Sequence, residues 1–454
     1  MLTDIKIRQA KARTTAHKLH DDQGLYLRVS PLKKDKKATP TKTFVFRYKW
    51  LDKDTTINIG RYGQCSLSDA RRKRDEYIDQ LLSGNNPAED KCSQSFSEMA
   101  AKPRARDLGL PFCGYPGPNN AITDIPGVRV GYTTLSNPKE NICTGVTAII
   151  PRDDKGAPMP TWAAQYSLNG NGEMTGCHWI NDAGYFVGPI CITNSHSVGM
   201  VHHGVTRWMI DRYSDYFQNE HAWAMPVVAE TYDGVLNDIN AQRVTAQDAI
   251  NALNNATHGE LEEGSVGGGN GMICYEFKGG TGTSSRLVTI AGTTYTIGTL
   301  VQANHGIRPW LTILGKPVGQ IMPKGRLFDQ EKGSIIVILG TDAPLSALSL
   351  RQLAKRAALG IGRGGSPGGN NSGDIFLAFS VANTRPVPQK DETIIIKEEL
   401  NNEFIDPLYL AVVEAVEEAV VNALVAGEDR QTFKPSGLVC QAIDKKKLSQ
   451  IFEQ

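Results

Sequence analysis

The sequence predicts a layered α/β sandwich from about residue 104 onward, preceded by a small α+β module within about residues 1–90. The 454 residues exceed the length of one ordinary domain and suggest at least two. Residues 1–97 hold 20 Lys and Arg against 12 Asp and Glu, while the rest of the chain holds 29 against 36. The net charge of +1 therefore averages two parts of opposite sign. Strand-like runs dominate the first part, whereas strands and helices are mixed in the second.

Composition and cysteine spacing exclude several classes of protein. A hydrophobic content of 40% with 21% charged residues does not fit collagen-like, coiled-coil or disordered chains. The first 20 residues lack the apolar stretch of a secretory signal, and no run reaches the roughly 18–20 apolar residues of a membrane span. The eight cysteines include no CxxC pair, which indicates reduced thiols. We therefore expect a cytoplasmic protein with no membrane contact.

The strands of the basic module are predicted at residues 24–29, 43–50 and 55–60. In these runs aromatic and β-branched residues recur between turn formers, which is typical of a small antiparallel sheet. The turn between the first two runs contains Lys33, Lys34, Lys36 and Lys37.

A basic helix is predicted to follow the sheet over residues 66–82. Ser66 and Asp69 resemble a capping box, and Gly84 with Pro87 beyond it ends the helix. The lysine-rich turn and this helix fit a phosphate-binding surface, but charge alone fits an ordinary solvated surface as well.

This first part resembles the arm-type DNA-binding domain of prophage tyrosine integrases. The resemblance rests on "KLHDDQGLYLRVSP" and, most specifically, on "IGRYGQCSLSDAR", and it covers about residues 1–90. "SQSFSEMA" at 93–100 resembles the start of the next integrase domain, but the likeness ends near Ala101, so residues 91–103 are expected to be a linker or fusion junction. The resemblance implies DNA binding without recombination, or a relic of a fused gene.

The second part is expected to contain buried strands and amphipathic helices in mixed order. A short strand follows the turn at Pro126–Gly127. Apolar runs predict further strands at 145–152, Tyr185–Thr193, Arg286–Tyr295, Ile335–Leu339 and Ile375–Phe379. Helices are predicted at 202–217, 245–255, 348–359 (closed by Gly360) and 405–425.

Several familiar motifs occur in sequence but lack the context that their chemistry needs. Residues 364–368 match GxSxG, yet a helix precedes them and Pro367 has no N–H to donate, so we expect a glycine-rich turn. The tracts 267–271 and 279–283 lack phosphate-loop spacing and favour close backbone packing. Metal-ligand spacing is likewise missing among His178, His196, His202 and His203.

The pattern most suggestive of chemistry involves two strand entries. Gly333 and Ser334 directly precede one apolar strand, and Ser372 and Asp374 stand two apart at the mouth of another. Alternate residues of an extended segment point the same way, so this hydroxyl and carboxylate could share one side of a site. By pattern alone, strand-entry turns built from small residues are the favoured interpretation.

From about residue 104 to 425 the chain resembles the L-aminopeptidase/D-esterase family, which includes the β-peptidyl aminopeptidases. The resemblance rests on ordered stretches that include "LNGNGEMTGCHWI", "PVVAETYDGVLNDI", "GSVGGGNGMICYEFKGGTGTSSR", "TLVQANHG" and "NNSGDIFLAFS". It implies that residues 104–454 form a four-layer αββα sandwich of the N-terminal-nucleophile type. It also implies one inactive chain that cleaves itself between Gly333 and Ser334, giving fragments 1–333 and 334–454.

The resemblance also implies a role for each site residue. Ser334 matches the nucleophile, and its new α-amino group, with a reference pKa of about 7.7–8.0, could accept a proton. Ser372 and Asp374 match residues that relay protons and hold the new ammonium. Asn304 matches an asparagine that stabilises the oxyanion, and Tyr232 matches a tyrosine at the same site.

The function implied is a self-processing serine aminopeptidase that removes N-terminal residues from short peptides, amides or esters. No metal or organic cofactor is expected, and family membership implies a homo-oligomer, with a tetramer as the expected form. The polar segment 326–332 suits an exposed, cleavable loop. The alternative is a DNA-binding protein that acts through residues 1–90 and carries an inert hydrolase-like scaffold.

Overall fold

The computed structural model describes residues 2–10, 15, 17–31, 41–50, 53–62, 67–82, 102–154 and 156–453. The chain divides into two compact units, residues 1–101 and 102–454, which are described separately. No helix in these described ranges combines the length and apolar character that a membrane span needs. The six cysteines within them are free thiols, as the sequence predicts: Cys113, Cys143, Cys177, Cys191, Cys274 and Cys440.

The N-terminal unit is a four-stranded antiparallel sheet with two helices. Strands β1 (His17–His20), β2 (Leu25–Val29), β3 (Lys42–Trp50) and β4 (Lys53–Arg61) pair in chain order. Helix α2 (Leu67–Leu82) packs on this sheet, and α1 (Asp4–Gln9) adds Ile7 to the same small core.

The three predicted strands and the basic helix of this unit are confirmed, whereas β1 and α1 were not predicted from the sequence. The lysine-rich turn with Lys33, Lys34, Lys36 and Lys37 lies outside the described residues, as do Ser66, Gly84 and the predicted junction over 91–101.

The C-terminal unit contains two large sheets. The six-stranded sheet runs in the order β13 (Gly280–Ile290), β14 (Thr293–Asn304), β15 (Ser334–Thr341), β16 (Asp374–Ser380), β7 (Pro160–Ser167) and β8 (Tyr185–Val187). The four-stranded sheet runs in the order β10 (Val227–Thr231), β9 (Ile190–Asn194), β6 (Ile142–Ile150) and β5 (Arg129–Asn137).

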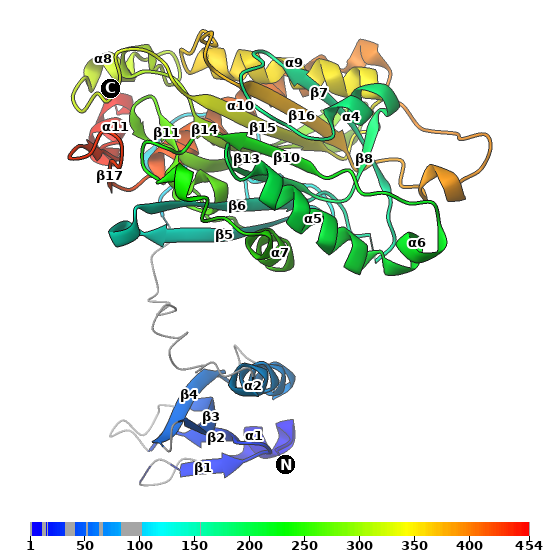
Figure 1. The fold of residues 1–454 in the computed structure, drawn as a ribbon, viewed down its shortest axis with the longest axis vertical. Helices are drawn as coiled ribbons and strands as arrows, with labels where there is room; N and C mark the ends of the chain where they lie inside the picture. The colour runs from blue at the N-terminus through cyan, green and yellow to red at the C-terminus, as the bar shows by residue number, and fades with distance from the viewer. Residues whose placement is uncertain are drawn as a thin grey trace. The chain divides into compact units, whose positions relative to one another are not determined.

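Helices cover the outer face of each sheet (Figure 1). Helices α9 (Ala347–Arg363) and α10 (Asp406–Val425) pack on the six-stranded sheet, and α5 (Val198–Arg212) and α7 (Ala246–Asn254) pack on the four-stranded sheet. Ile192 and Ala229 of the smaller sheet share a core with Ile336 and Leu377 of the larger one, so the two sheets face each other directly. The order helix, sheet, sheet, helix confirms the four-layer αββα sandwich.

Shorter elements complete this unit at its edges. They are α4 (Cys177–Ala183), α6 (Ser214–Asn219), α8 (Val318–Ile321), α11 (Lys445–Phe452), β11 (Ile273–Cys274), β12 (Phe277–Lys278), β17 (Arg430–Gln431) and β18 (Val439–Cys440).

The structure corrects two predicted strands. The run Tyr185–Thr193 forms two strands, β8 and β9, because Gly188, with φ of 93°, turns the chain from one sheet to the other. The run Arg286–Tyr295 spans the turn of the β13–β14 hairpin, where Ala291 and Gly292 both have positive φ. In both cases the residues on either side of the turn have strand-like composition, so local pattern alone does not separate the two strands.

Two predicted helices also differ in their bounds. The helix over 202–217 is two helices, α5 and α6, that meet at Tyr213. Helix α9 continues past Gly360 to Arg363. Gly360 does not end the helix; its lack of a side chain allows α9 to pack closely against α10. A Cβ at position 360 would lie 2.7 Å from Cβ of Val416 and 2.9 Å from the carbonyl oxygen of Val413.

The contact between α10 and β13 gives a test of the layer packing. A Cβ at Gly282 would lie 2.0 Å from the carbonyl oxygen of Ala419, so we expect Gly282→Ala to push the helix away and lower the free energy of unfolding by about 1–3 kcal/mol. Gly199 in α5 is the control, because nothing lies within 4 Å of a Cβ there and Gly199→Ala should be neutral or mildly stabilising. Denaturant unfolding measures both, and equal effects would contradict the packing argument.

Candidate active site

Strand β15 brings the predicted site residues together because it lies between β14 and β16. It pairs antiparallel with β14, where Ser334 is the partner of Asn304. It pairs parallel with β16, where Ile335 is the partner of Asp374. The ends of three adjacent strands therefore place a hydroxyl, an amide and a carboxylate at one edge of the large sheet.

Ser334 is the first residue of β15, and its residue surface is 8% exposed. Its Oγ accepts a hydrogen bond from the backbone N–H of Gly373 at 3.0 Å. Gly333 is needed because a Cβ there would lie 1.8 Å from the carbonyl oxygen of Asn304. The backbone before the nucleophile candidate is thus pressed against the neighbouring strand, and only glycine permits this approach.

Ser372 and Asp374, which the sequence predicts could share one side of a site, form a hydrogen-bonded pair. The Ser372 hydroxyl donates to Oδ1 of Asp374 at 2.5 Å. Oδ2 of Asp374 is buried and has no hydrogen-bond partner among the described residues. Burial is the main cause that raises the pKa of Asp374 from 3.8 to about 6. A carboxylate in this state is poised to receive a cation or a proton.

Strand alternation puts the Ser334 hydroxyl and the Asp374 carboxylate on opposite faces of the sheet. Ser334 shares the alternation of Ile336, which packs between the two sheets. Asp374 shares the alternation of Phe376, which packs in the core beneath the helices. The strand backbone at Ser334 lies between them, so its nitrogen is better placed than the hydroxyl to interact with Asp374.

Asn304 is held as an oriented amide. Its Oδ1 accepts from the N–H of Ile273 at 2.8 Å, and its Nδ2 donates to the carbonyl oxygen of Tyr232 at 3.0 Å. The amide has a second N–H, and no described residue accepts it. Tyr232 follows strand β10 and is 40% exposed, and because its carbonyl oxygen binds Asn304, the residue borders the site from the smaller sheet.

His305 does not add a base to the site. The ring is buried edge-on against Tyr275, and burial lowers its pKa to about 3. It is therefore neutral at physiological pH and a weak proton acceptor.

Two buried glutamates were not identified from the sequence. Glu331 lies in the segment predicted to be an exposed loop, and that prediction is wrong for this one residue, which is 7% exposed. Glu230 is the second-last residue of strand β10 and accepts hydrogen bonds from the N–H of Glu173 and the hydroxyl of Ser195. Burial raises the pKa of both carboxyl groups. A polar residue within a polar run, or at a strand end, carries no sequence signal of burial.

Glu230 is close to the nucleophile loop through Gly172. A Cβ at Gly172 would lie 3.2 Å from Oε1 of Glu230 and 3.5 Å from Cα of Gly373, whose N–H binds Ser334. One glycine therefore separates a buried carboxylate from the Ser334 loop.

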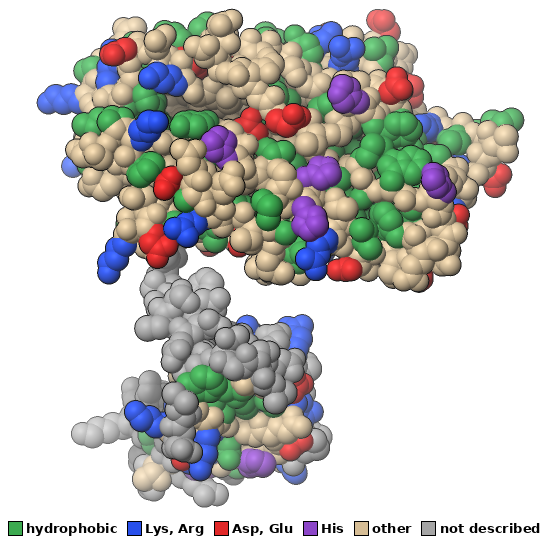
Figure 2. Space-filling view, viewed as in Figure 1, with side chains coloured by type: hydrophobic (Ala, Val, Ile, Leu, Met, Phe, Trp, Pro, Cys, Tyr) green, Lys and Arg blue, Asp and Glu red, His purple; other side chains and the backbone are tan. Residues whose placement is uncertain are grey.

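The remaining motifs behave as structural features. Residues 364–368 form a turn after α9, and Gly267–Gly271 packs against backbone on several sides, as predicted. Figure 2 shows histidine side chains at several separate places on one face of the C-terminal unit. Within the described ranges, no group of three or more His, Cys, Asp or Glu side chains is placed to hold a metal ion.

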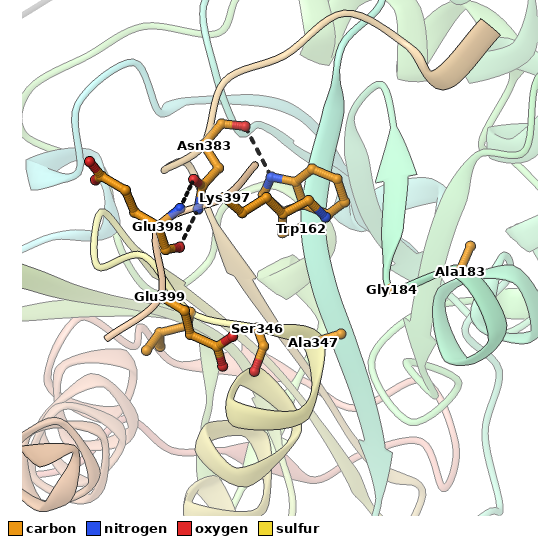
Figure 3. A pocket seen from close by; sticks show the side chains of 10 residues that line it. Trp162, Ala183, Gly184, Ser346, Ala347, Asn383, Lys397, Glu398 and Glu399 are labelled. Carbon is orange, nitrogen blue, oxygen red and sulfur yellow. Dashed lines mark hydrogen bonds between the residues drawn. The ribbon is translucent and has the colours of Figure 1, made fainter. Parts of the chain in front are cut away.

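A surface cavity of about 270 Å³ lies away from these strand ends (Figure 3). Trp162 and Asn383 line it, joined by a hydrogen bond of 3.1 Å, and Lys397 lies over the Trp162 ring at 3.1 Å. No predicted site residue lines this cavity, so it does not mark the reaction centre.

Comparison with known families assigns both parts of the chain. The family model Peptidase family S58 matches residues 120–436. The family model Arm DNA-binding domain matches residues 2–94. An arm-type DNA-binding domain therefore precedes the sandwich in the sequence.

Comparison with individual proteins agrees with this assignment. Beta-peptidyl aminopeptidase BapA from Sphingosinicella microcystinivorans is 46% identical over 352 residues, 72% of this chain and 87% of BapA. The L-aminopeptidase D-Ala-esterase/amidase from Ochrobactrum anthropi, a serine aminopeptidase with a variant of the Ntn-hydrolase fold, is 54% identical with a TM-score of 0.75, over 78% of this chain and 99% of the other. A Burkholderia sp. beta-aminopeptidase is 42% identical with a TM-score of 0.70, over 77% and 99%. The sandwich is thus an Ntn-hydrolase fold.

The buried carboxylate of Asp374 should cost stability. Its pKa of about 6 lies above the ordinary 3.8, so the folded state binds the proton more tightly and stability falls as the pH rises from about 4 to about 6. In a Ser334→Ala background, which keeps both proteins uncleaved, we expect Asp374→Asn to raise the free energy of unfolding at pH 7–8 by about 2–3 kcal/mol.

The same comparison at pH 4 is the control, because Asp374 is then largely protonated and the two proteins should differ little. A destabilising effect at pH 7–8 would contradict the assignment of an uncompensated carboxylate.

Proposed function

The chain belongs to peptidase family S58, and from this we propose that it is a self-processing serine aminopeptidase whose nucleophile is Ser334. One observation supports the assignment most strongly. Ser334 is the first residue of β15 and is paired with Asn304 on one neighbouring strand, while Asp374 on the other strand is paired with Ile335, the next residue. The proposed enzyme domain spans residues 104–454, after an arm module over 1–90 and a junction over 91–103.

The proposed first reaction is cleavage of the chain itself. Oγ of Ser334 attacks the carbonyl carbon of Gly333, the C–N bond between the two residues breaks, and the hydroxyl proton passes to the departing nitrogen. Water then hydrolyses the resulting ester, which regenerates the hydroxyl. The products are a fragment 1–333 with a new carboxylate and a fragment 334–454 with a new α-amino group.

The new α-amino group is the base of the proposed peptidase reaction. Its reference pKa of about 7.7–8.0 lets it accept the Ser334 hydroxyl proton near neutral pH. The attack on the substrate carbonyl forms an acyl-enzyme, and the ammonium returns the proton to the leaving amine. Water then attacks the acyl-enzyme by the same route. No metal or organic cofactor enters these steps.

The other predicted residues assist this base and the developing charges. Asp374, oriented by Ser372, stabilises the ammonium of Ser334 through its unpartnered Oδ2. Asn304 directs its second N–H at the oxyanion, since its other polar atoms are already bound. Tyr232, at the mouth of the site, supplies a second contact to the same intermediate.

An aminopeptidase must also bind the free ammonium of its substrate, and we assign this contact to Glu230. It is a buried carboxylate without an ion-pair partner among the described residues, and only Gly172 separates it from the Ser334 loop. Short peptides, amides and esters with a free amino group are the expected substrates. The relatives named above act as β-peptidyl aminopeptidase or as L-aminopeptidase and D-Ala-esterase, so both α- and β-amino acyl groups are candidates.

Further parts of the proposal concern partners and location. We propose a homo-oligomer, a tetramer as the family implies, which the exposure of Ile394 and Ile396 at 81% and 84% supports. The free thiols support a cytoplasmic location. The arm domain is proposed to bind duplex DNA without recombining it.

Replacement of the nucleophile tests the central proposal. On a denaturing gel, wild-type protein should split into fragments 1–333 and 334–454, whereas Ser334→Ala should stay intact and lose essentially all amidase activity. The matched control is Ser366→Ala, because Ser366 belongs to the GxSxG turn and should be dispensable for splitting. A single intact wild-type band without amidase activity would instead favour the inert-scaffold alternative.

Salt dependence tests the arm domain. The full chain should be retained on duplex DNA at about 50 mM salt and released steeply towards about 200 mM, because phosphate contacts release counterions. A chain that begins at residue 102 should not be retained under either condition. Equal retention of both proteins would contradict a DNA-binding role for the arm.

A further inference from the structure

Glu331 joins two loops on either side of the nucleophile. It lies three residues before Ser334, and its side chain turns back into the protein. Oε1 accepts from the N–H of Gly306 at 2.7 Å, and Oε2 accepts from the N–H of Gly369 at 3.1 Å. Among the described residues Glu331 has no ion-pair partner. Each of its carboxylate oxygens instead accepts a hydrogen bond from a backbone N–H.

The two loops that Glu331 joins carry the groups of the proposed reaction. Gly306 follows Asn304 by two residues at the end of β14. Gly369 begins the loop that leads to Ser372 and to the N–H of Gly373, which binds Ser334. Each oxygen of one carboxylate thus holds one side of the site.

The fit at these loops is specific to glycine. A Cβ at Gly369 would lie 2.1 Å from Oε2 of Glu331, so a side chain there would displace this carboxylate oxygen from its position. Gly306 has φ of 80°, a conformation that L-residues rarely adopt. The contact therefore depends on both glycines. Gly369 leaves space for the Glu331 carboxylate, and Gly306 adopts a backbone conformation that directs its N–H towards the same carboxylate.

The backbone between Glu331 and Ser334 is consequently held at several points. Glu331 is tied to the two loops, Gly333 lies against the carbonyl of Asn304, and Ser334 enters β15. The bond that breaks in the proposed self-cleavage lies within this short stretch. Fixing reacting groups in one geometry is a major source of rate acceleration.

We propose that Glu331 is a positioning residue for self-cleavage: its carboxylate links the two loops and so fixes the Gly333–Ser334 peptide beside the Ser334 hydroxyl. This inference rests on the proposed self-processing function. Glu331 does not touch the reacting atoms, and it acts through the backbone on both sides of them.

The segment before the cleavage point has separate anchors, so Glu331 is not needed to hold it. Glu276 accepts from the N–H groups of Leu327 at 2.5 Å and Phe328 at 2.7 Å. Arg308 donates to the carbonyl oxygens of Met322 and Lys324. Loss of the Glu331 contacts should therefore leave the loop attached while disturbing the scissile peptide.

The test is the rate of chain splitting after cell-free synthesis, followed on denaturing gels. In Glu331→Gln the amide presents a donor to one of the two N–H groups, and we expect splitting at least about tenfold slower than wild type. Asp329→Asn is the matched control, because it removes an exposed acid from the same segment and should split at the wild-type rate.

Two further measurements separate positioning from a general structural effect. Gly369→Ala would disturb the contact between Glu331 and the N–H of residue 369 without changing Glu331 itself, and it should also slow splitting. This second variant provides a test even if Glu331→Gln fails to fold. In fully split Glu331→Gln protein, kcat/KM for a peptide amide should fall much less than the splitting rate, with the thermal midpoint near that of wild type.

Wild-type splitting rates in both Glu331→Gln and Gly369→Ala would overturn the inference, as would equal losses of splitting and hydrolysis. If wild-type protein itself does not split, or splits elsewhere than at 333/334, the proposed function fails instead. The two failures are therefore distinguishable on the same gel.

Discussion

The pairing of β15 with β14 and β16 determines where Ser334, Asn304 and Asp374 lie. Side chains alternate between the faces of a strand, so a shift of one residue in this register would move Ser334 to the opposite face. The cores on the two faces prevent such a shift, because Ile336 packs between the sheets while Val337 packs beneath the helices. Hydrophobic packing of β15 therefore fixes the position of Ser334, with Asn304 opposite this residue on β14 and Asp374 opposite Ile335 on β16.

Around this strand end the protein buries carboxylates without burying cations to match. Asp374, Glu331 and Glu230 are each buried, burial raises the pKa of each, and none forms an ion pair among the described residues. Such groups cost folding free energy. The proposed reactions provide the missing positive charge, since self-cleavage creates one ammonium and an aminopeptidase substrate brings another. The buried negative charge that destabilises the uncleaved site therefore favours the binding of both ammonium groups.

The sequence predicted the layers of the sandwich better than the connections between strands and the buried polar residues around the proposed site. Continuous apolar runs marked β15 and β16, and ordered family stretches marked Ser334, Asn304 and Asp374. The run Tyr185–Thr193 was misassigned as one strand, because local periodicity does not reveal that the chain changes sheets at Gly188. Glu331 was assigned to an exposed loop, since its burial depends on N–H groups that lie 25 and 38 residues away in sequence. Long-range contacts of this kind leave no local pattern.

The central claim is that the Ser334 hydroxyl, on a chain that begins with this residue, carries the acyl group during turnover. The most direct measurement is peptide mapping by mass spectrometry after an acid quench of the enzyme with a slowly hydrolysed amino-acid ester. The account predicts a peptide with Ser334 as its first residue, a free α-amino group and the acyl group on Oγ. An active enzyme that shows the acyl group on Ser372 or another residue, or that has Ser334 still joined to Gly333, would contradict it.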